Sequence, residues 1–238
     1  MNNTSYVIMS RQAGLSKELT SIANNIANAD TTGFRREGVL FSEYVKSLGS
    51  AERSLSQTRV GGHFFDRSGG AMTKTGGAFD VAIDGEGFFA VETPRGERLT
   101  RAGSFMLNAE GQLTTPEGYS VLGEGGSPIT IPPGAGAITI AADGAIAGGG
   151  VPLGRLTLVT APATALQREG GSLFKATEPT QAAELAQLRQ GFVEGSNVNS
   201  VVELSRLIEV QRAYELGQQL LQQEHDRITK TVQAMGPR

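Results

Sequence analysis

The chain has 238 residues with neither Cys nor Trp, and its formal net charge at pH 7 is −3. This length allows one or two domains with an apolar core, while the lack of Cys excludes disulfides, thiolate metal ligands and a thiol nucleophile. No block of one charge sign and no apolar run of roughly 20 residues occurs, so we expect neither nucleic-acid binding nor membrane insertion.

Residues 1–34 are predicted to form an amphipathic helix that ends in a turn. Large apolar residues follow the alternating three–four spacing of a coiled-coil seam about two and a half heptads long: Ile8, Leu15, Leu19, Ile22 and Ile26. The segment lacks the charged start, apolar stretch and cleavage site of a secretory signal peptide.

The first helix is expected to end within SIANNIANADTTGF, residues 21–34. Asn favours caps and turns over helix interiors. Asn25 and Asn28 are therefore interpreted as caps of local backbone, or as paired donors and acceptors for a neighbouring helix. Gly33 permits the positive φ of a turn that ends the helix, and Phe34 can anchor the exit on apolar surface.

The middle of the chain changes character. Residues 35–75 contain a short apolar patch, VLFSEYV, and then a Ser- and Gly-rich stretch, which predicts an extended connector. Residues 76–175 contain short apolar or alternating runs such as FDVAID and GRLTLVT, punctuated by Gly, Pro, Asn and Asp. Turn signals at intervals of roughly ten residues are typical of an antiparallel β domain. Residues 176–199 are interpreted as a return segment.

Residues 200–238 predict a second, longer amphipathic helix. Ser200 and Glu203 fit a capping box at its start. Apolar residues repeat every seven positions, although polar residues such as Gln211 and Gln218 interrupt the complementary positions: Leu207, Tyr214, Leu221, Ile228 and Met235. A helix of about 50 Å is too long for the β domain to cover, so its apolar stripe predicts a helical partner.

The order of segments predicts an α+β fold. A Gly-rich antiparallel β domain is flanked by long N- and C-terminal amphipathic helices that form a coiled-coil-like layer. Within or between subunits, Leu15, Leu19, Ile22 and Ile26 are expected to pack against Leu204, Leu207, Ile208, Tyr214 and Leu221. Asn25, Asn28, Phe34 and Gln211 complete the predicted subunit-packing set.

No sequence pattern indicates catalysis. Residues 85–90, GEGFFA, match a dinucleotide-binding pattern, but a β-like sequence follows where that mechanism requires a helix, which favours a turn. His63 and His225 lack zinc-site spacing, and Asp80 and Asp84 suit strand and turn positions. We expect no enzyme, no catalytic residue, no cofactor, no metal and no small-molecule substrate.

Three blocks carry a family resemblance. ANNIANADTTGFRR, residues 23–36, resembles the N-terminal signature of the bacterial flagellar axial proteins, the rod and hook group, with Asp30 where members often have Asn. Residues 79–123, with G-x-G-F-F and T-R-x-G-x-F, are similar to the central block of that family. Residues 194–222, with S-N-V-N and Q-R-A-Y-E, are similar to its C-terminal block. Within the group, the chain looks most like the proximal rod proteins.

The resemblance implies a structural role in the flagellar basal body. Members stack helically around a central channel and form the drive shaft across the periplasm, with their terminal helices inside and the β domain further out. The implied partners are other rod subunits above and below and the flagellar type III export apparatus, which exports subunits without a cleaved signal. A distal rod or hook-type axial protein is an alternative within the family, and a β-rich binding module is an alternative of another class.

Overall fold

The computed structural model describes residues 3–46, 55–183 and 185–234, which fall into two compact units. The helical unit comprises Met1–Ala27, Glu37–Asp66 and Asn199–Arg238, and the β unit comprises Asn28–Arg36 and Arg67–Val198. Each unit therefore draws on segments that are far apart in the sequence.

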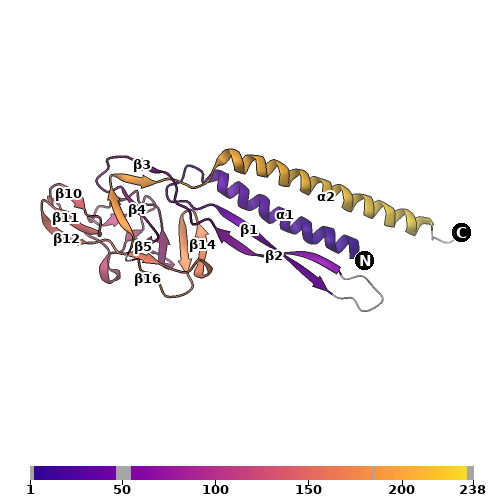
Figure 1. Cartoon of the computed structure of the whole chain (residues 1–238), viewed down its shortest axis with the longest axis horizontal. Coiled ribbons are helices and arrows are strands. Elements are labelled where there is room, and N and C mark those ends of the chain that lie inside the picture. The colour runs from indigo at the N-terminus through magenta and orange to yellow at the C-terminus, as the bar shows by residue number, and fades with distance from the viewer. Residues whose placement is uncertain (1–2, 47–54, 184, 235–238) are drawn as a thin grey trace. The chain divides into compact units, whose positions relative to one another are not determined.

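The helical unit contains two long helices and a hairpin. Helix α1 spans Asn3–Ala27 and helix α2 spans Ser200–Ala234. Strands β1 (Glu37–Lys46) and β2 (Leu55–Phe65) pair antiparallel. Helix α1 contacts α2 and both strands, with α2 on one side and the hairpin on the other (Figure 1). The packing of two long terminal helices confirms the predicted fold class.

Small residues allow the elements of this unit to approach α1 closely. A Cβ at Gly14 would lie 2.8 Å from the ring of Phe41 in β1, and a Cβ at Gly217 would collide with the Gln12 side chain. Ile22 is buried, as are Glu203 and Val210 on the side of α2 that faces α1. Two of the three are apolar, so this interface is only partly a hydrophobic seam.

The start of α2 differs from the prediction. Its cap is Asn199, because Oδ1 of that residue accepts from the backbone N–H groups of Val201 and Val202 at 3.1 and 3.2 Å. Ser200 is already the first helical residue. The Glu203 carboxylate instead accepts from Asn25 of α1. The predicted Ser200–Glu203 capping box is therefore wrong, since Asn at the N-cap satisfies the same orphan donors.

The β unit consists of short antiparallel strands and two 3₁₀ turns. Its elements are β3 (Met72–Lys74), β4 (Val81–Asp84), β5 (Phe88–Thr93), β6 (Gly96–Thr100), β7 (Met106–Leu107), β8 (Leu113–Thr114), β9 (Ser120–Val121), η1 (Glu124–Gly126), β10 (Ile138–Ile140), β11 (Ala145–Gly148), β12 (Val151–Arg155), β13 (Leu158–Thr160), η2 (Ala163–Ala165), β14 (Leu166–Gly170), β15 (Leu173–Ala176), β16 (Gln181–Ala182), β17 (Gln187–Gln190) and β18 (Phe192–Glu194).

The largest sheet of the described residues has the order β14-β15-β6-β5-β9-β8-β7, with β13 paired to β5 and β16. A three-stranded sheet, β10-β11-β12, and the pairs β17-β4 and β18-β3 complete the unit. One apolar core joins the two larger sheets and the β17–β4 pair: Val81, Ile83, Phe89, Val91, Phe105, Leu113, Val121, Ile129, Ile140, Ile146, Leu156 and Leu188.

The two segments that the sequence analysis interpreted as a connector and a return segment contain strands. The segment interpreted as a connector, residues 35–75, includes the hairpin β1–β2 and strand β3. The return segment, residues 176–199, includes β17 and β18, which pair with β4 and β3. The β unit thus extends past residues 76–175. Residues 85–87 link β4 to β5 without a helix, as the sequence predicts.

Candidate subunit interface

A buried asparagine joins three elements of the helical unit. The Asn25 side chain donates from Nδ2 to the Glu37 carbonyl oxygen at 2.8 Å and accepts from the Glu37 backbone N–H at 2.9 Å. Its Nδ2 also lies 3.0 Å from Oε2 of the buried Glu203. The Asn25 amide therefore makes the two hydrogen bonds to Glu37 that a neighbouring strand would make. It also connects α1 to α2 by its hydrogen bond to the Glu203 carboxylate.

Two further polar contacts set how the helices align. Arg206 donates from Nη2 to Oε1 of the buried Glu18 at 2.8 Å. Gln12 donates from Nε2 to the carbonyl oxygen of Tyr214 at 2.8 Å. Because the partner number rises along α2 as it falls along α1, the two helices run antiparallel.

The structure places the predicted packing residues in three settings. Ile22, Asn25 and Phe34 are buried. Other members of the set, on α1, in the turn after it and on α2, are half-buried: Leu15, Leu19, Ile26, Asn28, Leu207, Tyr214 and Leu221. Leu204, Ile208 and Gln211 are exposed within the chain. Asn28 and Phe34 belong to the β unit, so they do not take part in the α1–α2 contact.

One side of α2 carries exposed apolar residues. At 3.6 residues per turn, Leu204 and Ile208 are turned about 100–160° away from the buried Glu203 and Val210. We call the following set the outer face, with exposed fractions after each name: Val201 73%, Val202 57%, Leu204 51%, Ile208 45%, Leu216 60% and Leu220 52%. Such a group of large apolar side chains on one helix marks an interaction surface more often than a free one.

A buried carboxylate organises one end of the β unit. Oε1 of Glu194, a residue only 1% exposed, lies 2.7 Å from Nη2 of Arg35 and accepts from the Gly70 backbone N–H at 2.9 Å. Nε of Arg101 lies 3.0 Å from the other oxygen. That second contact is electrostatic, because neither atom meets a partner in hydrogen-bond geometry. One carboxylate thus compensates two buried guanidinium groups.

Arg101 extends this cluster to the Gly-rich turn between β4 and β5. Its Nη1 donates to the Gly87 carbonyl oxygen at 2.8 Å and its Nη2 to that of Gly85 at 2.9 Å. Burial lowers the pKa of Arg101 to about 10, and the neighbouring Glu194 opposes that shift. The side chain therefore remains cationic at neutral pH. The motif at residues 85–90 that matches a dinucleotide-binding pattern thus has a structural role, because its backbone carbonyl oxygens accept hydrogen bonds from Arg101.

The turn after α1 inserts into the same cluster. Gly33 has φ +67° and donates its N–H to the Glu194 carbonyl oxygen at 2.8 Å. A Cβ at Gly33 would collide with the backbone of Ala102. Because α1 ends at Ala27, Gly33 does not end the helix, contrary to the prediction. Phe34 is an anchor as predicted, since it is buried with the Arg168 guanidinium 4.2 Å from its ring centroid.

Sequence reasoning did not select the charged members of this cluster. Arg35, Arg101 and Glu194 all lie inside the three blocks that carry the family resemblance, in TTGFRR, TRAG and EGSNVN. Their pairing is invisible in a single sequence because the partners are far apart along the chain. The available signal was the position of each charge beside a Gly-rich or Asn-rich turn.

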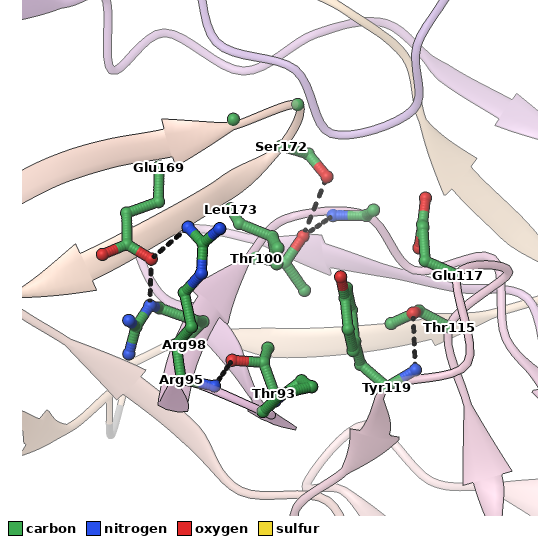
Figure 2. Close-up of a pocket in the computed structure, with 14 residues that line it drawn as sticks. Thr93, Arg95, Arg98, Thr100, Thr115, Glu117, Tyr119, Glu169, Ser172 and Leu173 are labelled. Carbon is green, nitrogen blue, oxygen red and sulfur yellow. Dashed lines mark hydrogen bonds and ion pairs between the residues drawn. The ribbon is translucent and has the colours of Figure 1, made fainter.

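A hollow of about 520 Å³ in the β unit tests the idea of a binding module (Figure 2). Its charged and hydroxyl groups largely bond one another: Arg98 Nε donates to Glu169 Oε2 at 2.7 Å, and Thr100 and Ser172 share a hydrogen bond at 3.2 Å. The hydrogen bond from Arg98 lowers the pKa of Glu169. These groups are arranged to stabilise the β6–β15 region rather than to converge on a ligand.

Two properties of the described residues concern metal binding and membrane insertion. No cluster of three or more His, Asp or Glu side chains is placed to hold a metal ion. Neither helix combines the length and hydropathy needed to cross a membrane.

Three family models match the chain in order. Residues 6–35 match the model described as "Flagella basal body rod protein". Residues 82–148 match "Flagellar hook protein FlgE/F/G D1 domain", and residues 189–234 match "Flagellar basal body rod FlgEFG protein C-terminal".

Curated relatives agree over nearly the full length. The chain is 40% identical to the flagellar basal-body rod protein FlgF of Caulobacter vibrioides, with 99% of each chain covered. It is 34% identical to FlgF of Escherichia coli, again with 99% of each chain covered. It is 31% identical to the flagellar basal-body rod protein FlgG of Bacillus subtilis, with 86% of this chain and 88% of the relative covered.

The Glu194 cluster predicts a large effect of removing one charge. Glu194→Gln leaves two buried guanidinium groups without a counter-charge, so we expect a loss of about 3–5 kcal/mol in the free energy of unfolding of the β unit. Urea unfolding with hydrogen exchange of β5 amides measures it. Asp143→Asn, which removes an exposed ion pair with Arg155, is the control and should cost at most about 1 kcal/mol. Equal losses in the two variants would contradict this account.

The Asn25 contacts predict that an isosteric change is harmful. Asn25→Asp replaces the Nδ2 donor by an acceptor beside the Glu37 carbonyl oxygen and the Glu203 carboxylate. We expect the helical unit to lose about 3 kcal/mol or more, measured by urea unfolding at the helical circular dichroism signal. Ser16→Asp adds a carboxylate on the exposed side of the same helix and should have little effect. A variant at Asn25 as stable as the one at Ser16 would refute the role of the amide.

Proposed function

We infer the role of this protein from its family: the chain belongs to the flagellar basal-body rod protein family and is a structural, non-enzymatic subunit of the rod. Membership implies assembly with other rod subunits. We propose that the terminal helices make these contacts, so that the chain polymerises helically into the proximal part of the drive shaft and around its export channel.

The outer face of α2 is the observation that supports this proposal. Helix α1 covers one side of α2, yet Leu204 and Ile208, which are turned away from that side, remain about half exposed. Completing the burial of a side chain of this size contributes about 1 kcal/mol or more, since full burial contributes about 1.5–3 kcal/mol. Six such residues on one helix provide a driving force that exposed ion pairs cannot match.

Residues inside the unit do not test assembly cleanly. Ile22 is buried against its own unit, so Ile22→Asp would disturb folding as well as assembly. Leu207, Tyr214 and Leu221 are half-buried within the chain and share this problem. Exposed residues of the outer face separate the two effects.

We therefore predict that Ile208→Asp abolishes rod assembly while the chain still folds. A carboxylate in a buried subunit contact costs about 3 kcal/mol, which weakens association about 100-fold at each contact. The measurements are motility, recovery of the subunit in isolated basal bodies, and circular dichroism of the purified chain.

Ile208→Leu is the matched control, because it keeps the outer face apolar and should assemble normally. Basal bodies that incorporate the Asp variant at the level of the Leu variant would refute assembly through α2.

We also propose that the subunit reaches the rod through the flagellar type III export apparatus with its N-terminal segment intact. A cleaved signal of about 15–30 residues would remove Gln12, and one of about 18 residues or more would also remove Glu18; both side chains bond α2. The mature protein therefore needs α1. Mass spectrometry of subunits taken from basal bodies should find the peptide that contains these residues, and a mature chain beginning beyond Glu18 would exclude the proposal.

A further inference from the structure

The chain passes between the helical unit and the β unit at four points, after Ala27, Arg36, Asp66 and Val198. The last three of these points lie within two residues of Asn197 or of a group to which Asn197 is hydrogen-bonded. Three of the covalent links between the units therefore leave the β unit from one hydrogen-bonded group inside it.

Asn197 holds three segments of the β unit together. Its Oδ1 accepts from the Arg36 backbone N–H at 2.6 Å, and its backbone N–H donates to the Phe34 carbonyl oxygen at 3.3 Å. Its Nδ2 donates to the Ser68 carbonyl oxygen at 2.9 Å and lies 3.4 Å from the hydroxyl oxygen of the same residue. We call Asn197, together with Phe34, Arg36 and Ser68, the latch.

The latch lies at one end of the β3–β18 strand pair. These strands pair antiparallel, with Met72 opposite Glu194. Past this position the Gly195 N–H donates to the Ala71 carbonyl oxygen at 2.9 Å, and the Nδ2 bond of the latch comes next along both segments. The two segments that continue to the links after Asp66 and Val198 thus leave the strand pair at the same end.

This geometry is mechanically weak without the latch. The hydrogen bonds of an antiparallel pair lie perpendicular to the strands, so tension applied to both strands at one end loads the outermost bond first. The next bond is loaded only after that one has broken, and the strands peel apart one bond at a time. The latch places further bonds outside the strand pair, and it also ties in the segment that contains Phe34 and Arg36.

We propose that the latch keeps the β unit closed when force pulls on the links between the two units. This inference rests on the proposed function, because a subunit of a drive shaft carries load between its parts. Three links share the latch, so tension in each of them reaches Asn197 or its partners before it reaches the paired strands.

Optical-tweezers measurements on the purified full chain test this proposal. The chain has no Cys, so His63→Cys and Val201→Cys provide two attachment points, one on each side of the main β-unit segment in the sequence. Their side chains are 47% and 73% exposed. Complete opening of the β unit is identified by its length, because the segment between the links releases about 130 residues, or roughly 450 Å of chain.

Asn197→Ala removes the side-chain bonds of the latch. We expect it to raise the rate of opening at constant force by about tenfold or more, since the net loss of one hydrogen bond changes a rate by roughly that factor and forced opening is governed by the unfolding rate. Asn197→Ser, which also lacks the Nδ2 donor, gives a second measurement if the Ala variant does not fold.

Asn108→Ala is the matched control. Asn108 lies between β7 and β8, is half-buried like Asn197, and bonds Gln112 and the Glu110 backbone through both its Oδ1 and its Nδ2. Its bonds are not next to any link, so its loss should leave the opening rate under this tension nearly unchanged. Equal opening rates of the Asn197 and Asn108 variants would overturn the proposal.

A second direction of pulling separates the latch from general stability. Glu117→Cys and Val151→Cys place both attachment points on exposed residues inside the β unit, away from the links. Pulling there does not load the latch first, so Asn197→Ala should accelerate opening much less than it does between the links. Equal acceleration in the two directions would also overturn the proposal. Neither result bears on the proposed function, which Ile208→Asp tests through assembly.

Discussion

The charge balance around Glu194 is the constraint on which the β unit depends. A lone buried guanidinium is costly, and here two of them share one carboxylate. The arrangement is tolerable because backbone carbonyl oxygens accept further hydrogen bonds from both guanidinium groups: Arg101 bonds Gly85 and Gly87, and Arg35 bonds Ser68. The buried charges of three chain segments therefore compensate one another only when all three segments are in place.

Asn197 reinforces the same region through neutral groups. Its Oδ1 accepts from the Arg36 backbone N–H at 2.6 Å, and its Nδ2 donates to the Ser68 carbonyl oxygen at 2.9 Å. An asparagine suits this position because it offers a donor and an acceptor on one short side chain. The S-N-V-N block thus has a structural reason, as does Asn25 in the helical unit.

The sequence predicted the helices and the β character well because both depend on local periodicity. It could not decide which side of α2 faces α1, since Leu204 and Ile208 fit a seam as well as Leu207 and Tyr214 do. That choice depends on polar contacts with distant residues, above all Glu203 with Asn25. The cap at Asn199 was missed because Ser200 satisfies the same local pattern.

The Arg35–Glu194–Arg101 cluster could not be predicted from the sequence for the same reason, because its members are distant in the chain. A single sequence shows charges and turns, whereas the pairing of partners so far apart is a property of the folded topology. Each of the three residues lies in a block that carries the family resemblance, but the blocks indicate neither their contact nor their chemical role.

The pairing of β18 with β3 has a kinetic consequence. Val193 faces Thr73 and Leu188 faces Ile83, so these strands close loops of roughly 100–120 residues. The chain loses entropy when it closes such a long loop, before the strand contacts contribute any stabilisation. These strands are therefore expected to pair more slowly than local pairs such as β5–β6. A subunit delivered with its N-terminus first would keep the β unit open until its last fifth emerged. If the subunit is exported as proposed, this slow and late closure delays folding of the β unit until most of the chain has been delivered.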